Sequence, residues 1–265
     1  MTHVRLLCRF EHPSLRQPRW GVLENTALYP LADEQLYNLI DAPELVEKPV
    51  EAGEAKLLAP IIPSKVVCVG RNYQDHAAEL GNPMPAEPLL FLKPPSSIIG
   101  PEAAIELPSV SSRVEHEGEL GVVIGRWARH LGAGDNPLDY VLGYTCVNDV
   151  TARDLQRRDV QFTRAKSFDT FCPIGPYIVL ADLDPSDLQV ETRVNGAVRQ
   201  QGRTGQMAFP VPYLIRYISH VMTLAPGDVI STGTPAGVGP LAPGDVCEVE
   251  IEQVGTLRNF VRAGH

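Results

Sequence analysis

The segment 113–125 constrains the fold of this chain more than any other stretch, because it places three carboxylates just before a short β-branched run. The run at 120–124 predicts a buried strand, since it is bounded by glycines and is too short for a helix. Residues two apart on a strand point to the same face, so a strand that began earlier would align Glu115, Glu117 and Glu119 in one row. Carboxylates this close repel one another unless a divalent cation lies among them or solvent surrounds them. The stretch therefore predicts either a metal site or a solvated strand edge, and the residues alone leave both open.

Composition excludes several classes of protein. The chain has 265 residues, 44% of them hydrophobic, which is enough for a full core. Its net charge of −9 and its lack of a basic run argue against a nucleic-acid partner. The N-terminus has no signal-peptide pattern and no apolar run has membrane-spanning length, so we expect a cytoplasmic protein with no membrane partner. Five widely spaced cysteines predict buried thiols and neither disulfides nor a zinc site.

The order of elements predicts a mixed, mainly β architecture. Short strand-like runs recur at irregular spacing with only a few short helices, which differs from a doubly wound α/β pattern. An Asn-Gly pair at 195–196 predicts a hairpin, and apolar spacing over 211–222 predicts a helix. Two prolines close together at 60–63 indicate a linker. We therefore expect a small β-rich N-terminal module over residues 1–59 and the main domain over 60–265.

A candidate acid–base pair follows the predicted strand at 65–70. Asp75 could cap a short helix in which His76 and Glu79 are three residues apart and share one face. A carboxylate beside an imidazole can orient the ring for general-base catalysis, but an exposed ion pair on a surface helix is the alternative. Prolines at 82–85 make this helix a candidate mobile lid.

Other polar residues have two interpretations each. Asp149 follows a predicted strand and precedes a predicted helix, so it is either an N-cap or a site residue. Lys93 ends another predicted strand, where it could face a site or reach solvent, and we expect the latter. Lys166 is unremarkable by its spacing alone. The Gly- and Thr-rich segment 229–239 predicts a loop whose amides and hydroxyls could hold an anionic group.

Six motifs occur in order along the chain. They are Gly-Arg-Asn-Tyr-x-x-His-x-x-Glu at 70–79, Phe-Leu-Lys-Pro at 91–94, His-Glu-Gly-Glu-Leu at 116–120, Asn-Asp-Val-Thr-Ala-Arg-Asp at 148–154, Ala-Lys-Ser-Phe-Asp at 165–169 and Thr-Gly-Thr-Pro-Ala-Gly-Val-Gly at 232–239. Together they resemble the fumarylacetoacetate hydrolase superfamily, and within it the acylpyruvate hydrolase and oxaloacetate decarboxylase subgroup. The resemblance runs from about residue 60 to the C-terminus. It implies a mixed β-sandwich roll with few short helices, and a homodimer.

The resemblance also implies a metal site. It places one Mg²⁺, with Mn²⁺ as the alternative, on Glu117, Glu119 and Asp149. Glu115 lies outside the matched motif, so we expect it to be dispensable. The segment 149–166 is shorter than in the animal acylpyruvases, which leaves the pocket wall and the size of the substrate open.

Catalytic and substrate-binding roles follow from the same resemblance. It implies that His76 and Glu79 form a catalytic pair on a lid and that Lys166 is the active-site lysine. It further implies that Arg71 and Thr234 contact the carboxylate of the substrate.

The activity implied by the resemblance is cleavage of a C–C bond in acylpyruvate-type 2,4-dioxo acids, such as fumarylpyruvate or acetylpyruvate, through a metal-stabilised enolate. In this reaction His76 would take a proton from the attacking water, and Lys166 would add positive charge near the enolate. Decarboxylation or keto–enol tautomerisation of oxaloacetate-like 2-oxo acids is the alternative and uses the same residues. A noncatalytic metal-binding protein is the third hypothesis.

Overall fold

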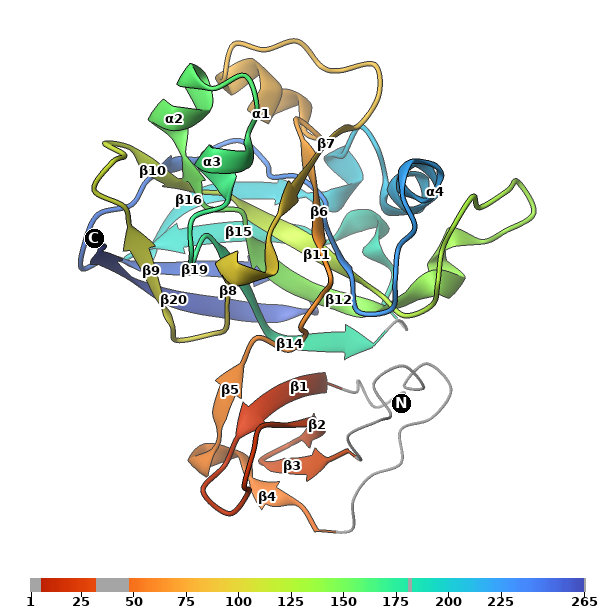
Figure 1. The fold of residues 1–265 in the computed structure, drawn as a ribbon, viewed down its shortest axis with the longest axis vertical. Coiled ribbons are helices and arrows are strands. Elements are labelled where there is room, and N and C mark those ends of the chain that lie inside the picture. The colour runs from red at the N-terminus through yellow and green to blue at the C-terminus, as the bar shows by residue number, and fades with distance from the viewer. Residues whose placement is uncertain (1–5, 32–47, 181–182, 265) are drawn as a thin grey trace.

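Strands dominate the computed structural model, which describes residues 6–31, 48–180 and 183–264 and is mainly β, as predicted (Figure 1). The largest sheet has 12 strands and follows the order β4-β3-β2-β1-β14-β12-β11-β17-β6-β7, with β5 paired to β1 and β8 paired to β14. Its strands are β1 (Leu6–Glu11), β2 (Arg19–Glu24), β3 (Ala27–Pro30), β4 (Val50–Glu51), β5 (Lys56–Leu58), β6 (Val66–Gly70), β7 (Leu89–Lys93), β8 (Ile98–Ile99), β11 (Gly118–Ile124), β12 (Val141–Asn148), β14 (Cys172–Leu180) and β17 (Val229–Ser231).

Two smaller sheets complete the β structure. One has five strands in the order β16-β15-β19-β20-β9, and the other has three in the order β13-β10-β18. The predicted Asn-Gly hairpin is confirmed, because Asn195 and Gly196 join β15 to β16 with positive φ angles of 53° and 76°. The strands are β9 (Ala104–Leu107), β10 (Val114–His116), β13 (Thr151–Ala152), β15 (Gln189–Val194), β16 (Ala197–Arg203), β18 (Gly239–Pro240), β19 (Val246–Ile251) and β20 (Gly255–Ala263).

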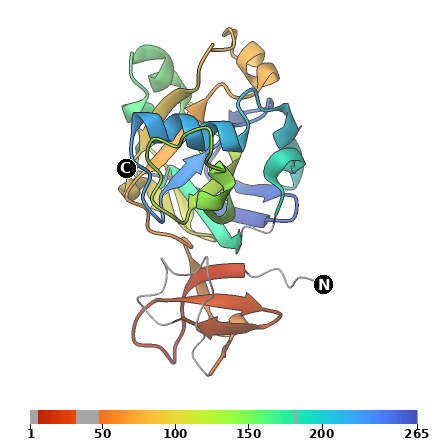
Figure 2. The same cartoon turned by 90° about the vertical axis from the view of Figure 1, so that its right-hand side faces the viewer.

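The α-helices are short apart from α4, which confirms the helix predicted over 211–222. Helices α1, α2 and α3 lie at the end of the molecule remote from β1–β4 (Figures 1 and 2). Within the described ranges, no helix combines the length and the apolar character needed to cross a membrane. The helices are α1 (Gln74–Glu79), α2 (Arg153–Arg158), α3 (Thr163–Lys166) and α4 (Val211–Val221).

Strand β11 has a different apolar core on each face. Leu120 and Val122 pack in one cluster with Leu214 of α4. Val123 faces the opposite way, in a cluster with residues of β6 and β14. Glu119 is four residues from Val123 and shares its face, so its carboxylate lies at the end of an apolar layer. This placement explains why Glu119 is buried.

The prediction of one continuous carboxylate strand is wrong. Strand β10 ends at His116 in the three-stranded sheet, and β11 begins at Gly118 in the largest sheet. Glu117 lies where the chain crosses between the two sheets. A Cβ atom on Gly118 would lie 2.1 Å from Thr192 Oγ1, so this crossing requires glycine. Glu115 therefore does not share a strand face with Glu119.

Strands β1–β4 form a small meander that extends the largest sheet beyond β14 (Figure 1). Strand β1 pairs with β14 through Leu6 opposite Val179, and β5 pairs back onto β1. The Trp20 indole donates a hydrogen bond of 2.9 Å to the carbonyl of Pro60 in the predicted linker. The division into a module over 1–59 and a domain over 60–265 stays a prediction, and residues 1–5 and 32–47 of that module lie outside the described ranges.

Candidate active site and metal centre

Three buried carboxylates from the β10–β12 region meet at one point. Oxygen atoms of Glu117, Glu119 and Asp149 lie within 4.8 Å of one another. The antiparallel register of β11 and β12 pairs Gly118 with Asn148, and the Asp149 amide donates a 2.9 Å hydrogen bond to the Glu117 carbonyl. Strand pairing thus brings together acids that are about thirty residues apart in the sequence.

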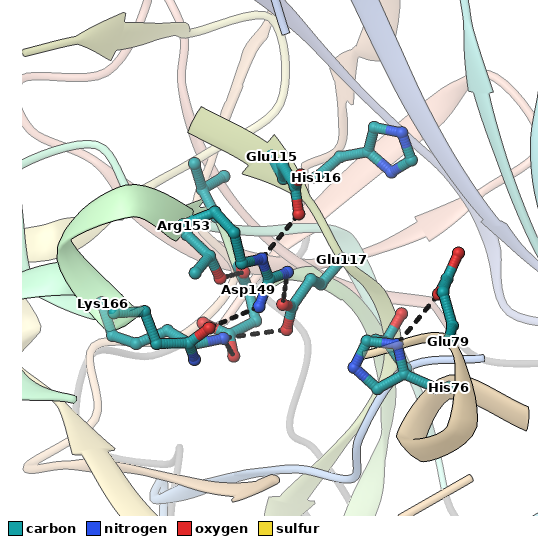
Figure 3. A network of polar contacts seen from close by, with 12 residues as sticks. His76, Glu79, Glu115, His116, Glu117, Asp149, Arg153 and Lys166 are labelled. Atoms are coloured by element: carbon teal, nitrogen blue, oxygen red, sulfur yellow. Dashed lines mark hydrogen bonds and ion pairs between the residues drawn. The ribbon is translucent and has the colours of Figure 1, made fainter. Parts of the chain in front are cut away.

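Two buried lysines neutralise part of this charge. Lys93 Nζ donates to Asp149 Oδ1 at 2.6 Å. Lys166 Nζ donates to Asp149 Oδ2 at 2.5 Å and to Glu117 Oε2 at 2.8 Å (Figure 3). The expectation that Lys93 reaches solvent is wrong, because its side chain is fully buried. Asp149 is also not an N-cap, since Ala152 holds that position in α2. The place of Lys93 in the Phe-Leu-Lys-Pro motif was the signal that could have marked it as a site residue.

Arg153 joins Glu115 to the carboxylate cluster. Its Nε donates to Glu115 Oε2 at 2.6 Å, and its Nη2 forms a short ion pair with Glu117 Oε1 (Figure 3). Glu115 is buried and also accepts a hydrogen bond from Arg113. The expectation that Glu115 is dispensable therefore conflicts with the structure, because Glu115 fixes the guanidinium that contacts Glu117.

Two of the acids, Glu117 and Glu119, have pKa values shifted in opposite directions. Burial, together with the negative charges of Asp149 and Glu117, raises the pKa of Glu119 to about 8. Burial also opposes ionisation of Glu117, but Lys166 and Arg153 outweigh it and hold the pKa of that carboxyl far below its usual range. For Lys166, burial is outweighed by Asp149 and Glu117, which raise the pKa of the ammonium group. In the metal-free protein, the charged form of Lys166 is therefore favoured, whereas the charged form of Glu119 is disfavoured.

The donor set fits a hard divalent cation. All three side chains offer carboxylate oxygens, the ligands that Mg²⁺ and Mn²⁺ prefer. Glu119 Oε2 accepts hydrogen bonds from Ser231 Oγ and from the Gly233 amide at 2.9 Å, and these groups are uncharged. A cation that replaced the Glu119 proton would relieve the repulsion that raises its pKa.

Helix α1 carries the predicted acid–base pair. His76 Nδ1 lies 3.4 Å from Glu79 Oε2, which leaves Nε2 of the imidazole for other partners (Figure 3). The Glu79 carboxylate also accepts the Gly237 amide at 3.1 and 3.2 Å, and so connects α1 to the Gly- and Thr-rich loop. The prediction that Asp75 caps the helix is wrong, because Tyr73 is its N-cap.

One cavity of about 200 Å³ collects nearly all the predicted site residues. Glu79 is the exception, since it lies behind His76 and orients it. The lining residues among those predicted are Arg71, His76, Glu117, Glu119, Asp149, Lys166 and Thr234.

The Thr234 hydroxyl is occupied by protein partners. Thr234 Oγ1 donates to the Gly118 carbonyl at 2.8 Å and accepts from Gln200 Nε2 at 2.7 Å. The orientation of the Gln200 amide is determined by its neighbours, since its Oε1 accepts the Gly118 amide and its Nε2 donates to the Pro235 carbonyl. The hydroxyl hydrogen of Thr234 is therefore already used within the protein. Sequence reasoning missed Gln200, which comes from β16 and carries no local signal.

Comparison with known proteins identifies the family. Residues 65–262 match the family described as fumarylacetoacetate (FAA) hydrolase, C-terminal. The oxaloacetate tautomerase YisK of Bacillus subtilis (strain 168) is 46% identical over 222 residues, which cover 78% of this chain and 73% of that protein.

Two solved structures have the same fold. The 2-hydroxyhepta-2,4-diene-1,7-dioate isomerase from Mycobacterium marinum superposes with a TM-score of 0.88 at 43% identity and covers 98% of each chain. The maleylpyruvate hydrolase from Sphingobium sp. SYK-6, in complex with manganese(II) and pyruvate, superposes with a TM-score of 0.80 at 33% identity, covering 98% of this chain and 100% of that chain. These matches confirm the predicted type of β fold. The chain is an enzyme and belongs to the fumarylacetoacetate hydrolase family.

Proposed function

We propose that this enzyme binds one divalent cation, Mg²⁺ or Mn²⁺, and transforms 2-oxo acids at the carbon next to the 2-oxo group. One observation carries the proposal: the carboxylates of Glu117, Glu119 and Asp149 share a cavity with His76 and Lys166. A cation-binding cluster, a base and a lysine ammonium in one cavity are the groups that such chemistry needs.

Each side chain has a distinct task in this proposal. Glu117, Glu119 and Asp149 would hold the cation, which supplies positive charge for the carboxylate and 2-oxo oxygens of the substrate. Lys166 adds a second positive charge at the same end of the cavity and stabilises negative charge that develops on the 2-oxo oxygen. His76, oriented through Nδ1 by Glu79, uses Nε2 to accept and return a proton.

Keto–enol tautomerisation of an oxaloacetate-like acid is the activity that these groups support best. His76 Nε2 would take a proton from the carbon next to the 2-oxo group, and the electron pair of that C–H bond would move toward the 2-oxo oxygen. Protonation of this oxygen completes the enol, and the reverse steps restore the keto acid. The 46% identity to an oxaloacetate tautomerase over most of the chain supports this choice.

Hydrolysis of a 2,4-dioxo acid is a second candidate, favoured by the likeness to a maleylpyruvate hydrolase over 98% of the chain. His76 would accept a proton from water as its oxygen attacks the distal carbonyl. The C–C bond between this carbonyl and the pyruvate fragment then breaks. Its electron pair stays on the pyruvate fragment, which takes up a proton, and the other product is a carboxylic acid.

Product analysis separates these activities. EDTA-treated protein is supplied with Mg²⁺ or Mn²⁺ and mixed with oxaloacetate or acetylpyruvate, and the enol absorbance, pyruvate and CO2 are followed. Faster decay of the oxaloacetate enol without pyruvate identifies a tautomerase, and pyruvate with CO2 identifies a decarboxylase. Pyruvate with acetate from acetylpyruvate identifies a hydrolase. The proposal is wrong if the cation accelerates none of these reactions.

A further inference from the structure

The cavity changes its chemical character from its floor to its rim. Its lining carboxylates and Lys166 are almost fully buried and form its floor. Two half-buried aromatic rings, Phe91 and Phe162, also line the cavity, with centroids 5.6 Å apart in an edge-to-face arrangement and the Lys166 ammonium 5.0 Å from the Phe91 centroid. Arg157 of α2 lines the same cavity and is itself exposed, which places it at the solvent-facing rim. An apolar wall between two charged ends suits a short carbon chain with an anionic group at each end.

Helix α2 presents three polar side chains to this cavity. Arg153, Gln156 and Arg157 are at positions i, i+3 and i+4 and share a helical face. The Arg153 guanidinium is already occupied, because it contacts Glu117 and donates to Gln156 Oε1 at 2.6 Å. Arg157 lies one turn further along the helix, and its guanidinium is not part of that network.

The acidic residues around Arg157 have other partners. Asp154 accepts hydrogen bonds from Ser111 and Ser112, and Asp159 accepts two from Arg164. Among the described residues, no hydrogen bond or ion pair joins the Arg157 side chain to another group. A guanidinium without an internal partner at the rim of a substrate cavity is available for an anion from solution, which it can bind through two parallel hydrogen bonds.

We infer that Arg157 is a specificity-determining residue that selects 2-oxo acids with a second carboxylate at the end remote from the 2-oxo group. The inference rests on the proposed function, since it takes the 2-oxo acid end to lie at the floor of the cavity. The cation and Lys166 account for the first carboxylate. Arg157 accounts for the second, and the substrate class is therefore the 2-oxo dicarboxylates.

Binding of matched acids tests this assignment. Oxaloacetate is compared with 2-oxobutanoate, and 2-oxoglutarate with 2-oxopentanoate, because the members of each pair differ only in the terminal carboxylate. Affinities are measured by calorimetry on protein loaded with Mn²⁺, for the wild type, Arg157→Ala and Arg158→Ala. Arg158 is the matched control, since it neighbours Arg157 but does not line the cavity.

We expect the wild type and Arg158→Ala to bind the dicarboxylate of at least one pair roughly 10- to 100-fold more tightly than its partner. Arg157→Ala should lose this preference and bind the monocarboxylate with unchanged affinity. An Arg157→Ala protein that keeps the full preference overturns the inference alone. A wild type that prefers dicarboxylates in neither pair also overturns it. Turnover of oxaloacetate is measured on the same samples, so an Arg157-dependent preference without turnover contradicts only the proposed function.

Discussion

Glu119 is the acid whose proton a cation must displace. Its pKa of about 8 in the folded protein is far above the ordinary value of 4.5 that applies to the unfolded chain. Between these two values, the metal-free native state binds a proton that the unfolded state has released. The free energy of unfolding of the metal-free protein therefore decreases as pH rises through this window.

We predict that the melting temperature of EDTA-treated protein falls as pH rises from the Glu119 pKa of the unfolded chain toward about 8. In the same window, the affinity for Mn²⁺ should increase by about tenfold per pH unit, because the cation competes with one proton. Calorimetric titrations and melting curves across this range measure both effects. The Glu119→Gln variant is the control, since it has no titrating group at this position. Its melting temperature should lack the part of the pH dependence that Glu119 contributes. A wild-type Mn²⁺ affinity that does not change with pH would contradict this account.

Substitution of Glu115, with substitution of Arg113 as its control, is a second test at the residue scale. Replacing Glu115 by Ala leaves the buried Arg153 without one of its two carboxylates, which should lower the free energy of unfolding by roughly 3 kcal/mol. It should also weaken Mn²⁺ binding by about tenfold, because Arg153 orients Glu117.

Arg113→Ala is the matched control for Glu115→Ala. Arg113 contacts the same carboxylate but is half-exposed, so its loss should cost less than about 1 kcal/mol. Urea unfolding and Mn²⁺ titration compare the two variants. Equal effects would mean that Glu115 contributes no more to the site than an exposed ion pair.

The stability of helix α1 depends on its contacts with other elements. It has six residues, too few to be stable by itself, and the Glu79 contact with the Gly237 amide joins it to the loop after β17. The same carboxylate orients His76. The position of the His76 imidazole and the position of α1 are therefore coupled through the Glu79 side chain.

We predict that Glu79→Ala and His76→Ala separate these two effects. Glu79→Ala should increase amide hydrogen exchange in α1 and lower kcat, because it frees both the helix and the imidazole. His76→Ala should lower kcat by roughly 10²- to 10⁴-fold while amide exchange in α1 and Mn²⁺ affinity stay as in the wild type. Loss of Mn²⁺ from the His76→Ala protein would overturn the role given to this residue.

Local sequence patterns predicted individual strands, turns and helices better than they predicted which elements pack or pair with one another. The strand at 120–124 follows from a short β-branched run bounded by glycines, the hairpin at 195–196 from turn chemistry and the helix at 211–222 from helical apolar spacing, all within a few positions. The break at Glu117 does not, because it depends on the packing of Gly118 against a distant strand. Strand register is likewise a property of the whole sheet.

The candidate site also has features that local motifs predicted and features that depend on distant contacts. The motifs predicted the candidate ligand and acid–base residues that line the cavity, because each short motif contains its own candidate residues. They did not reveal that Lys93 is buried against Asp149 or that Gln200 holds Thr234, since each contact joins side chains more than thirty residues apart. Contacts between charged side chains on different strands can be predicted only when the strand register is known as well as the sequence.

At the scale of the whole molecule, the largest sheet continues from the catalytic region into β1–β4 without a break in strand order. Strand β7 is at the opposite end of this order, and its Leu92 is 46% exposed. An exposed apolar sheet edge can pair with another chain. Together with the family resemblance, this supports a homodimer.

We predict that light scattering coupled to size exclusion gives a mass twice the 28.9 kDa of one chain. The mass should not depend on Mn²⁺, because the carboxylate cluster is internal to one chain. A mass of one chain at micromolar concentration would contradict the dimer while leaving the assignment of the site untouched.

The central claim is that Glu117, Glu119 and Asp149 hold one divalent cation, and Mn²⁺ titration of EDTA-treated protein by electron paramagnetic resonance tests it most directly. The wild type and His76→Ala should each bind one Mn²⁺ per chain with the same affinity. Glu119→Gln, which keeps the shape of the side chain and removes its charge, should lose this binding together with turnover. Unaltered Mn²⁺ stoichiometry and affinity in Glu119→Gln would contradict the account.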